Sequence, residues 1–275
     1  MKVRWLGWAG VEIEAEGATL VIDPLEDPAA TFAALPHEVL AKVPMPSVTA
    51  PAARGTAAAG LVTHLHRDHT DATALAKALA PDAVVREPGW PGGEEAANFS
   101  LAQATSELDA AGLERSETEA WQRLEVGPFA ITAMPAVDGL GDPQLSWLVE
   151  AGGQRVLHLG DTIFHGYWWR MGRAAGPFDV VLAPVNGAAV NFPHLQPPSP
   201  LAAAMEPEQA ALAGELLRAR TVVPIHFGGF DIDPWYRPVA EPLARFRAAA
   251  AERSYETKVL DPGESLELLT GVGTA

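Results

Sequence analysis

The fold is decided by the stretch Thr63-His64-Leu65-His66-Arg67-Asp68-His69. It follows the apolar run 60–62, which is typical of a short buried strand. His64 and His66 stand two residues apart on the expected turn, so they can point the same way and bind one cation through neutral imidazoles. Asp68 and His69 can face a second cation beside it. The turn is therefore predicted to be a metal site rather than an exposed polar loop.

A pair of divalent metals about 3.5–4 Å apart needs a bridging carboxylate, and it can generate hydroxide at neutral pH and clamp the attacked group. The chain has no cysteine, so the ligands must be histidines and carboxylates, and disulfides, zinc fingers and iron–sulfur clusters are excluded. The sequence also has no Gly-x-Ser-x-Gly elbow and no Walker-type loop. Their absence argues against a serine hydrolase and a P-loop nucleotide site.

The composition is that of a packed globular protein. Of the 275 residues, 48% are apolar and 20% are charged, which excludes a disordered chain. The formal net charge of −16 repels phosphate backbones, and no basic patch offsets it, so nucleic acid is not expected as a partner. No segment approaches the roughly 20 apolar residues that span a bilayer, and the N-terminus lacks a signal-peptide pattern. We therefore expect a cytoplasmic protein without a membrane partner.

Strand and helix patterns are mixed along the whole chain. Strands are expected at 3–6, 11–15 and 19–22, and helices at 71–79, 93–111, 207–219 and 238–251. Residues 25–57 are rich in proline and alanine and are expected to form an irregular loop that covers something. No repeat and no linker divides the sequence, so residues 1–275 are expected to form a single domain.

The His-x-His-x-Asp-His turn resembles the hallmark of the metallo-β-lactamase superfamily. Other parts of the chain resemble that family's opening strands, its Gly-Asp-Thr turn and its strand-end histidine; these are Trp5-Leu6-Gly7, Leu20-Val21-Ile22-Asp23-Pro24, Leu159-Gly160-Asp161-Thr162 and Val223-Pro224-Ile225-His226. The branch of L-ascorbate-6-phosphate lactonase and similar metal-dependent hydrolases is the most similar, on Asp71, Tyr167-Trp168-Trp169 and Phe178-Asp179-Val180-Val181-Leu182. The resemblance implies an α/β (α+β) fold, a four-layer αβ/βα sandwich with metals at one edge.

The resemblance also implies a set of metal ligands. The first site takes His64 and His66, the second takes Asp68, His69 and His226, and Asp161 bridges them.

One ligand position departs from the family. A histidine is expected about twenty residues before the bridging aspartate, and this chain has Asp138 there. An added carboxylate favours harder ions, so the expected cofactor is one or two divalent metals, Zn²⁺ or Mn²⁺, with Fe²⁺ as a further candidate. The alternative is that Asp138 only caps the turn before Gly139 and leaves the first site short of a ligand.

Five residues are candidates for roles in catalysis or substrate binding. Asp68 is expected to orient the attacking hydroxide or relay its proton, and His165 is a candidate to protonate the leaving group. Trp8 stands where the family often has histidine, and it either narrows the pocket beside the substrate or is a core tryptophan. Asn186 is a candidate to orient the substrate. Arg170 is a candidate to bind an anionic group, although a solvated helix arginine is the commoner case.

The expected function is hydrolysis of a small-molecule ester, lactone or phosphoester by a metal-bound hydroxide. One alternative is a phosphodiesterase of the same fold. Another is a non-catalytic metal-binding module whose first metal site is degenerate because of Asp138. A hydrolase is ranked first because every other ligand position is filled. The eight tryptophans leave scope for a buried interface in a homo-oligomer.

Overall fold

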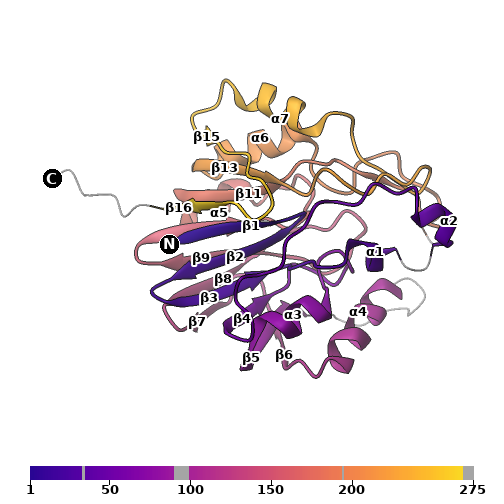
Figure 1. The fold of residues 1–275 in the computed structure, drawn as a ribbon. Coiled ribbons are helices and arrows are strands. Elements are labelled where there is room, and N and C mark those ends of the chain that lie inside the picture. The colour runs from indigo at the N-terminus through magenta and orange to yellow at the C-terminus, as the bar shows by residue number, and fades with distance from the viewer. Residues whose placement is uncertain (33–34, 90–98, 194, 269–275) are drawn as a thin grey trace.

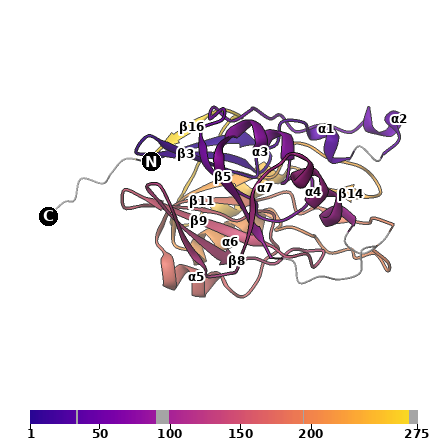
Figure 2. The same cartoon turned by 90° about the horizontal axis from the view of Figure 1, so that it is seen from below.

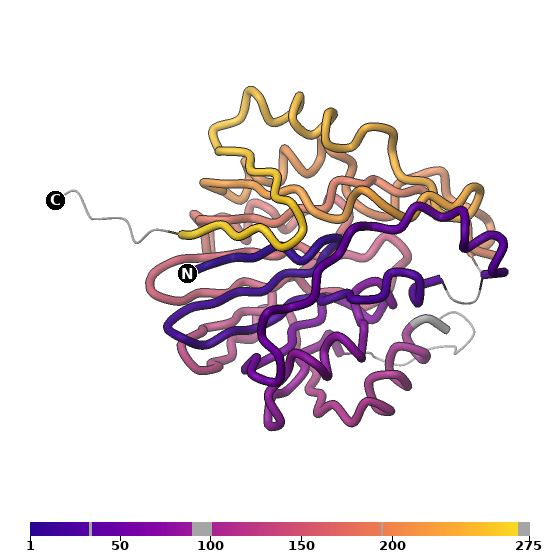
Figure 3. The backbone as a smooth tube through the Cα atoms, in the orientation of Figure 1, coloured from indigo at the N-terminus to yellow at the C-terminus, as the bar shows by residue number. Residues whose placement is uncertain are grey.

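Figure 1 shows a computed structural model of the chain, which describes residues 1–32, 35–89, 99–193 and 195–268. The first of its two large sheets contains β1 (Lys2–Gly7), β2 (Gly10–Ala15), β3 (Ala18–Ile22), β4 (Ala57–Leu61), β5 (Leu79–Pro88), β6 (Arg115–Thr118) and β16 (Ser265–Glu267). They are ordered β16-β1-β2-β3-β4-β5-β6. The pairs around β1 and β2 are antiparallel, whereas β3 to β6 are parallel neighbours. The indigo N-terminal strand lies beside the yellow C-terminal strand in Figure 3.

The second sheet contains β7 (Arg123–Val126), β8 (Phe129–Pro135), β9 (Leu145–Ala151), β10 (Gln154–His158), β11 (Phe178–Pro184), β13 (Ala219–Ile225) and β15 (Glu256–Thr257). Its order is β15-β13-β11-β10-β9-β8-β7. It is mixed as well, because β7 to β10 form an antiparallel meander and β10, β11, β13 and β15 are parallel. A separate two-stranded ribbon is formed by β12 (Ala189–Val190) and β14 (Tyr236–Arg237).

Seven helices complete the described structure: α1 (Pro28–Thr31), α2 (His37–Leu40), α3 (Ala72–Ala78), α4 (Phe99–Ala110), α5 (Trp168–Ala175), α6 (Pro207–Leu216) and α7 (Pro242–Ala250). Apolar residues of α3 and α4 pack on the first sheet, and those of α5, α6 and α7 pack on the second. In Figure 2, β3 and β16 lie above β9 and β11, and α5 lies below them. The predicted four-layer αβ/βα sandwich is thus confirmed.

The main core lies between the two sheets. Side chains of the first sheet, such as Ile13 and Leu20, meet Phe129 and Trp147 of the second, and all four are fully buried. The alternation of apolar residues with glutamates in β2 places Val11, Ile13 and Ala15 in this core, as expected for a strand with one face inward. Of the described helices, none is long and apolar enough to cross a bilayer.

Several predicted elements are confirmed, with differences at their ends. The strands at 3–6, 11–15 and 19–22 are β1, β2 and β3, and the helix at 71–79 is α3. The helix predicted at 93–111 corresponds to α4, with 93–98 outside the described residues. The helix predicted from Pro238 begins only at Pro242, because Tyr236 and Arg237 pair with β12 and the Val239 amide bonds to Asn186. Helix α5 has no side-chain N-cap, so the sequence gives no start signal for it.

The carboxyl ends of several strands meet at one edge and bring the polar loops together. Each of five strands is followed within three residues by a residue of the site; the pairs are β3 and Asp23, β4 and His64, β8 and Asp138, β10 and Asp161, and β13 and His226. Such an edge is where α/β sheets commonly place their ligands.

Candidate metal centre

The predicted ligands form two adjacent groups in which the ligand atoms lie within 4.8 Å of one another. The first group is His64, His66, Asp138 and Asp161, and the second is Asp68, His69 and His226. The rings of His64 and His69 join the groups, with centroids 4.2 Å apart. The six residues that the resemblance implied as ligands are therefore brought together with Asp138. Their action as ligands, and the bridging role of Asp161, remain predictions.

Short distances run through both groups. In the first, Nε2 of His64 lies 2.8 Å from Nδ1 of His66 and 3.5 Å from Oδ1 of Asp161. In the second, Oδ2 of Asp68 lies 3.5 Å from Nε2 of His69 and 3.4 Å from Nε2 of His226. Each group thus directs nitrogen and oxygen atoms at a common point, which is the arrangement that a cation needs.

The chemistry of the donors fits divalent metals. The Nε2 atoms of His69 and His226 face each other at 3.1 Å, where only one of them can be a hydrogen-bond donor to the other. The two groups contain four imidazoles and three carboxylates, with no lysine or arginine among these described members. A cation between the facing lone pairs and carboxylates would satisfy both, and imidazole with carboxylate suits Zn²⁺, Mn²⁺ and Fe²⁺.

Electrostatics favours positive charge at the centre. Burial lowers the pKa of His66, but Asp138 and Asp142 outweigh it and raise that pKa to about 10. Burial and the neighbouring His69 and His66 hold the pKa of His64 well below its ordinary value, so this imidazole is neutral, the form that binds metals.

A layer of acceptors orients the histidines from behind. Nδ1 of His69 lies 2.7 Å from Oδ2 of Asp23, and Nε2 of His66 lies 2.8 Å from Oδ2 of Asp142. Asp23 is itself held by the backbone N–H and hydroxyl of Thr63, at 2.8 and 2.6 Å. A carboxylate on one ring nitrogen fixes the tautomer that presents the other nitrogen to a metal. Asp23 and Asp142 were not among the predicted site residues; their only sequence signals were a strand end and a Gly-Asp pair.

The position of Asp138 is compatible with both roles that were treated as alternatives. Its Oδ1 accepts the backbone N–H groups of Leu140 and Asp142 at 2.7 and 3.1 Å, which caps the turn. Its Oδ2 points to the other members of the first group and lies 3.9 Å from Nδ1 of His66. Gly139 is needed beside it because a Cβ there would lie 2.1 Å from the carbonyl oxygen of Ala203. Capping the turn therefore leaves one oxygen of Asp138 available to a metal.

A cavity of about 470 Å³ opens onto both groups. The lining includes His66, Arg67 and four aspartates, and its apolar wall consists of Phe32, Leu35, Leu101, Leu140, Ala188, Val190, Phe192, Pro193, Leu195, Ala203 and Ala204. Most of this wall comes from the Pro-rich segments 187–204 and 25–57, the second of which was expected to form a covering loop.

Trp8 lies behind the second group. It is 1% exposed, its Nε1 donates to Oδ2 of Asp68 at 2.9 Å, and its ring centroid is 3.9 Å from that of His226. It is outside the described lining of the cavity. This position matches the core tryptophan alternative and gives no support to a contact with substrate.

His165 and Arg170 lie outside the described cavity lining. The His165 ring stacks on Trp168 with centroids 3.9 Å apart, and burial lowers its pKa to about 4, so it is neutral at neutral pH. Arg170 is exposed, and its guanidinium lies 4.7 Å from the ring centroid of Trp121. Neither position supports the roles predicted for these residues.

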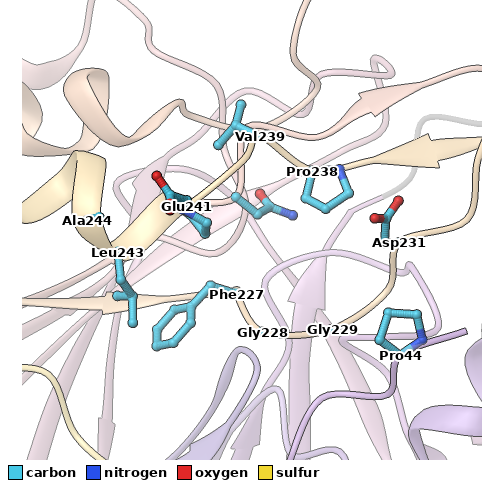
Figure 4. A pocket seen from close by; sticks show the side chains of 12 residues that line it. Pro44, Phe227, Gly228, Gly229, Asp231, Pro238, Val239, Glu241, Leu243 and Ala244 are labelled. Carbon is cyan, nitrogen blue, oxygen red and sulfur yellow. The ribbon is translucent and has the colours of Figure 1, made fainter.

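Asn186 does not line this cavity itself but contacts Tyr236, which does. It is 1% exposed, and its Nδ2 donates to the hydroxyl of Tyr236 at 2.6 Å. Tyr236 lines the cavity, whereas Asn186 lines a second, largely apolar cavity of about 480 Å³. Figure 4 shows this second cavity between Phe227, Gly228 and Gly229 on one side and Pro238 and Val239 on the other. The sequence analysis missed Tyr236, which follows no recognisable motif.

Comparison with known proteins agrees with this geometry. The profile described as the beta-lactamase superfamily domain matches residues 18–227. A UPF0173 metal-dependent hydrolase of Geobacillus sp. is 30% identical over 284 aligned residues, covering 98% of this chain and 100% of that protein. A UPF0173 metal-dependent hydrolase of Thermococcus kodakarensis is 28% identical over 276 residues, with coverages of 98% and 100%. The solved structure of Igni18, a metallo hydrolase of Ignicoccus hospitalis, has the same fold, with a TM-score of 0.63 at 19% identity over 98% of this chain and 99% of that one.

Proposed function

Because the chain belongs to the β-lactamase superfamily and, within it, to the UPF0173 metal-dependent hydrolases, we propose that it hydrolyses an uncharged small-molecule ester or lactone. Zn²⁺ or Mn²⁺ is the proposed metal. The observation that supports this most directly is the pair of His/Asp groups at the base of a cavity with an apolar wall. Ester and lactone hydrolysis needs such a place for a carbonyl beside an activated water.

The residues of the two groups would hold the metals, and the bound metals would activate both the attacking water and the carbonyl group of the substrate. A bound divalent ion lowers the pKa of a water molecule toward neutrality and polarises a carbonyl oxygen. Asp23 and Asp142 would keep His69 and His66 in the binding tautomer.

Asp68 is the residue proposed to orient the attacking water. Its Oδ2 is engaged by Trp8 and faces His69 and His226. No hydrogen bond to its Oδ1 is found within the described part of the chain, and the residue lines the cavity. Burial opposes ionisation, but the neighbouring His69 and His226 hold the pKa of Asp68 well below its ordinary value. It would therefore be an acceptor that orients the water.

The charges of the cavity favour an uncharged substrate. Asp68, Asp138 and Asp161 belong to the metal-ligand groups, so bound metals would offset their charge, and Asp142 pairs with His66. Arg67 is the one arginine or lysine among the described lining residues, and Glu107 pairs with it at 2.8 Å. A second bond joins its guanidinium to the carbonyl oxygen of Ala30. No free arginine or lysine is thus available for a phosphate in the described lining. The lack of such a cation favours lactone chemistry like that of the L-ascorbate-6-phosphate lactonase branch, but with a substrate that carries no phosphate. It also disfavours the phosphodiesterase alternative.

The test combines metal analysis with a substrate panel. The protein, loaded with Zn²⁺ or Mn²⁺, is expected to retain at least one equivalent of metal and to hydrolyse 4-nitrophenyl butyrate and γ-octalactone faster than bis(4-nitrophenyl) phosphate. Faster release from the phosphodiester would favour the phosphodiesterase. Full metal content without turnover of any probe would favour the non-catalytic module, and metal well below one equivalent would overturn the metal site itself.

A further inference from the structure

Tyr236 is held firmly in the wall of the metal-side cavity. It opens β14 and pairs with Val190 of β12, and both residues line the cavity. Its backbone N–H and carbonyl both bond to Ile232, at 2.9 and 2.7 Å. The ring of Phe32 meets its ring edge-on with centroids 6.2 Å apart. The phenol is therefore placed by the ribbon rather than by a loose loop.

The hydrogen bonding of the phenol leaves its proton free. Nδ2 of Asn186 donates to the hydroxyl oxygen at 2.6 Å. A tyrosine hydroxyl has one O–H donor besides its acceptor lone pairs. No acceptor for that O–H is found among the described residues. The backbone of Asn186 is fixed in turn, since its main-chain carbonyl oxygen accepts the Val239 N–H at 2.8 Å. The amide thus occupies the acceptor side of the phenol, and the donor side remains for a ligand.

The charge environment keeps the phenol protonated. Burial, together with Asp68 and Asp161, raises the pKa of Tyr236 well above its ordinary value. These aspartates belong to the two metal-ligand groups, and they line the same cavity as Tyr236. The Oδ1 atom of Asn186 is buried and has no hydrogen-bond partner among the described residues. Asn186 therefore donates to the phenol while its own side-chain oxygen has no hydrogen-bond partner, which is unusual for an amide with only a packing role.

We propose that Tyr236 is a catalytic residue that donates a hydrogen bond to the substrate oxygen on which negative charge develops, and that Asn186 is its positioning residue. This inference rests on the proposed ester or lactone hydrolysis. The phenol keeps its proton throughout, so no bond to hydrogen is broken at this residue. A rigid donor aimed at a developing oxyanion commonly contributes about 10²–10³-fold to kcat.

The kinetic test uses two tyrosine-to-phenylalanine variants. Tyr236→Phe removes only the hydroxyl, and kcat for γ-octalactone is expected to fall about 10²-fold, with KM changed much less and metal content unchanged. Tyr255→Phe is the matched control, because it also removes a buried hydroxyl, one that donates to the Ala211 carbonyl beneath α6, and it should retain wild-type kcat. Asn186→Leu should lower kcat by a smaller factor than Tyr236→Phe. Wild-type kcat in Tyr236→Phe at full metal content would overturn the inference.

A binding test separates this inference from the proposed function. Hexylboronic acid becomes tetrahedral and carries negatively charged oxygens when it binds, and its affinity for the metal-loaded protein can be measured by calorimetry. Tyr236→Phe should bind it at least tenfold more weakly, and Tyr255→Phe should bind it as the wild type does. If the wild type hydrolyses no ester or lactone, the proposed function fails, and the boronate affinities still decide the role of Tyr236. Equal affinity in wild type and Tyr236→Phe, or no binding to either, overturns the inference.

Discussion

The indole N–H of Trp8 donates a hydrogen bond of 2.9 Å to Oδ2 of Asp68, across 60 residues of sequence. The same carboxylate oxygen faces His69 and His226, at 3.5 and 3.4 Å. The tryptophan therefore controls the direction of one predicted ligand and packs on another. Its backbone has a φ of 50°, a conformation that most residues avoid.

Replacing Trp8 with phenylalanine should weaken metal binding at the second group. Trp8→Phe keeps an aromatic ring beside His226 but removes the donor that orients Asp68, and partners of this kind typically contribute about 10–100-fold in metal affinity. Titration against a competing chelator measures the change. Trp169→Phe is the control, because Trp169 is exposed and should bind metal as the wild type does. Unchanged affinity in Trp8→Phe would show that Asp68 needs no orientation from the indole.

Substitutions of Asp138 should separate its capping role from its role toward the metal. Asp138→Asn can keep Oδ1 as the acceptor for Leu140 and Asp142, so its melting temperature should stay close to that of wild type without metal. It loses the charged oxygen that points to the first group, and it should bind less metal and lose most activity. Metal analysis and thermal melts give the two readouts.

Asp138→His tests whether the first site is degenerate. The imidazole cannot accept both backbone N–H groups that Asp138 accepts, and it is longer, so we expect lower metal content and activity. A gain in both would indicate instead that Asp138 disables the site and that histidine repairs it.

Freeing Arg67 should change the response of the cavity to anions. In Glu107→Gln the guanidinium loses its carboxylate partner at 2.8 Å and is left as a free cation in the cavity wall. Inorganic phosphate should then inhibit ester hydrolysis several-fold more strongly than in wild type. The exposed Glu252→Gln variant changes the net charge equally and should show wild-type inhibition. Equal inhibition of all three proteins would contradict the assignment of Arg67 as a neutralised cation.

Glu87 should make stability dependent on pH away from the metal centre. It is 5% exposed, and burial raises its pKa from the ordinary 4.5 although Arg115, at 3.7 Å, opposes this. A glutamate whose pKa is raised in the folded state contributes its full stabilisation below the unfolded pKa of 4.5. That stabilisation is lost as the pH rises through the folded-state pKa. Glu87→Gln should therefore melt a few degrees higher than wild type at pH 7, with the gain shrinking as pH falls toward 4.

The control for this melting experiment is Glu14→Gln. Glu14 is an exposed strand residue near Lys2, and its melting temperature should differ little from wild type at either pH. A Glu87→Gln gain that persists unchanged at pH 4 would show that the effect is not ionisation.

Local patterns were enough to predict the strands, helices α3 and α4 and the types of ligand, whereas α1 and α2 lie in the segment that was predicted to be an irregular loop. The alternation in β2 and the apolar run before His64 specify strands because a strand's period is set by its own backbone. The His-x-His-x-Asp-His motif was predictable as a metal-binding turn because its side chains are close together in the sequence. The start of α7 and the presence of α5 were not predictable, because the pairing of β14 with β12 and the packing of Trp168 decide them.

The sequence by itself determined the histidine and aspartate chemistry and the exclusion of cysteine-based sites, and its resemblance to a known family implied the layer architecture. Only the tertiary structure decided that Trp8 donates a hydrogen bond to Asp68, that Asp142 contacts His66, and that Asn186 donates a hydrogen bond to Tyr236. These pairs are separated by 60, 76 and 50 residues. Contacts at such separations depend on which strands become neighbours in the two sheets, and a local pattern of residues does not contain that information.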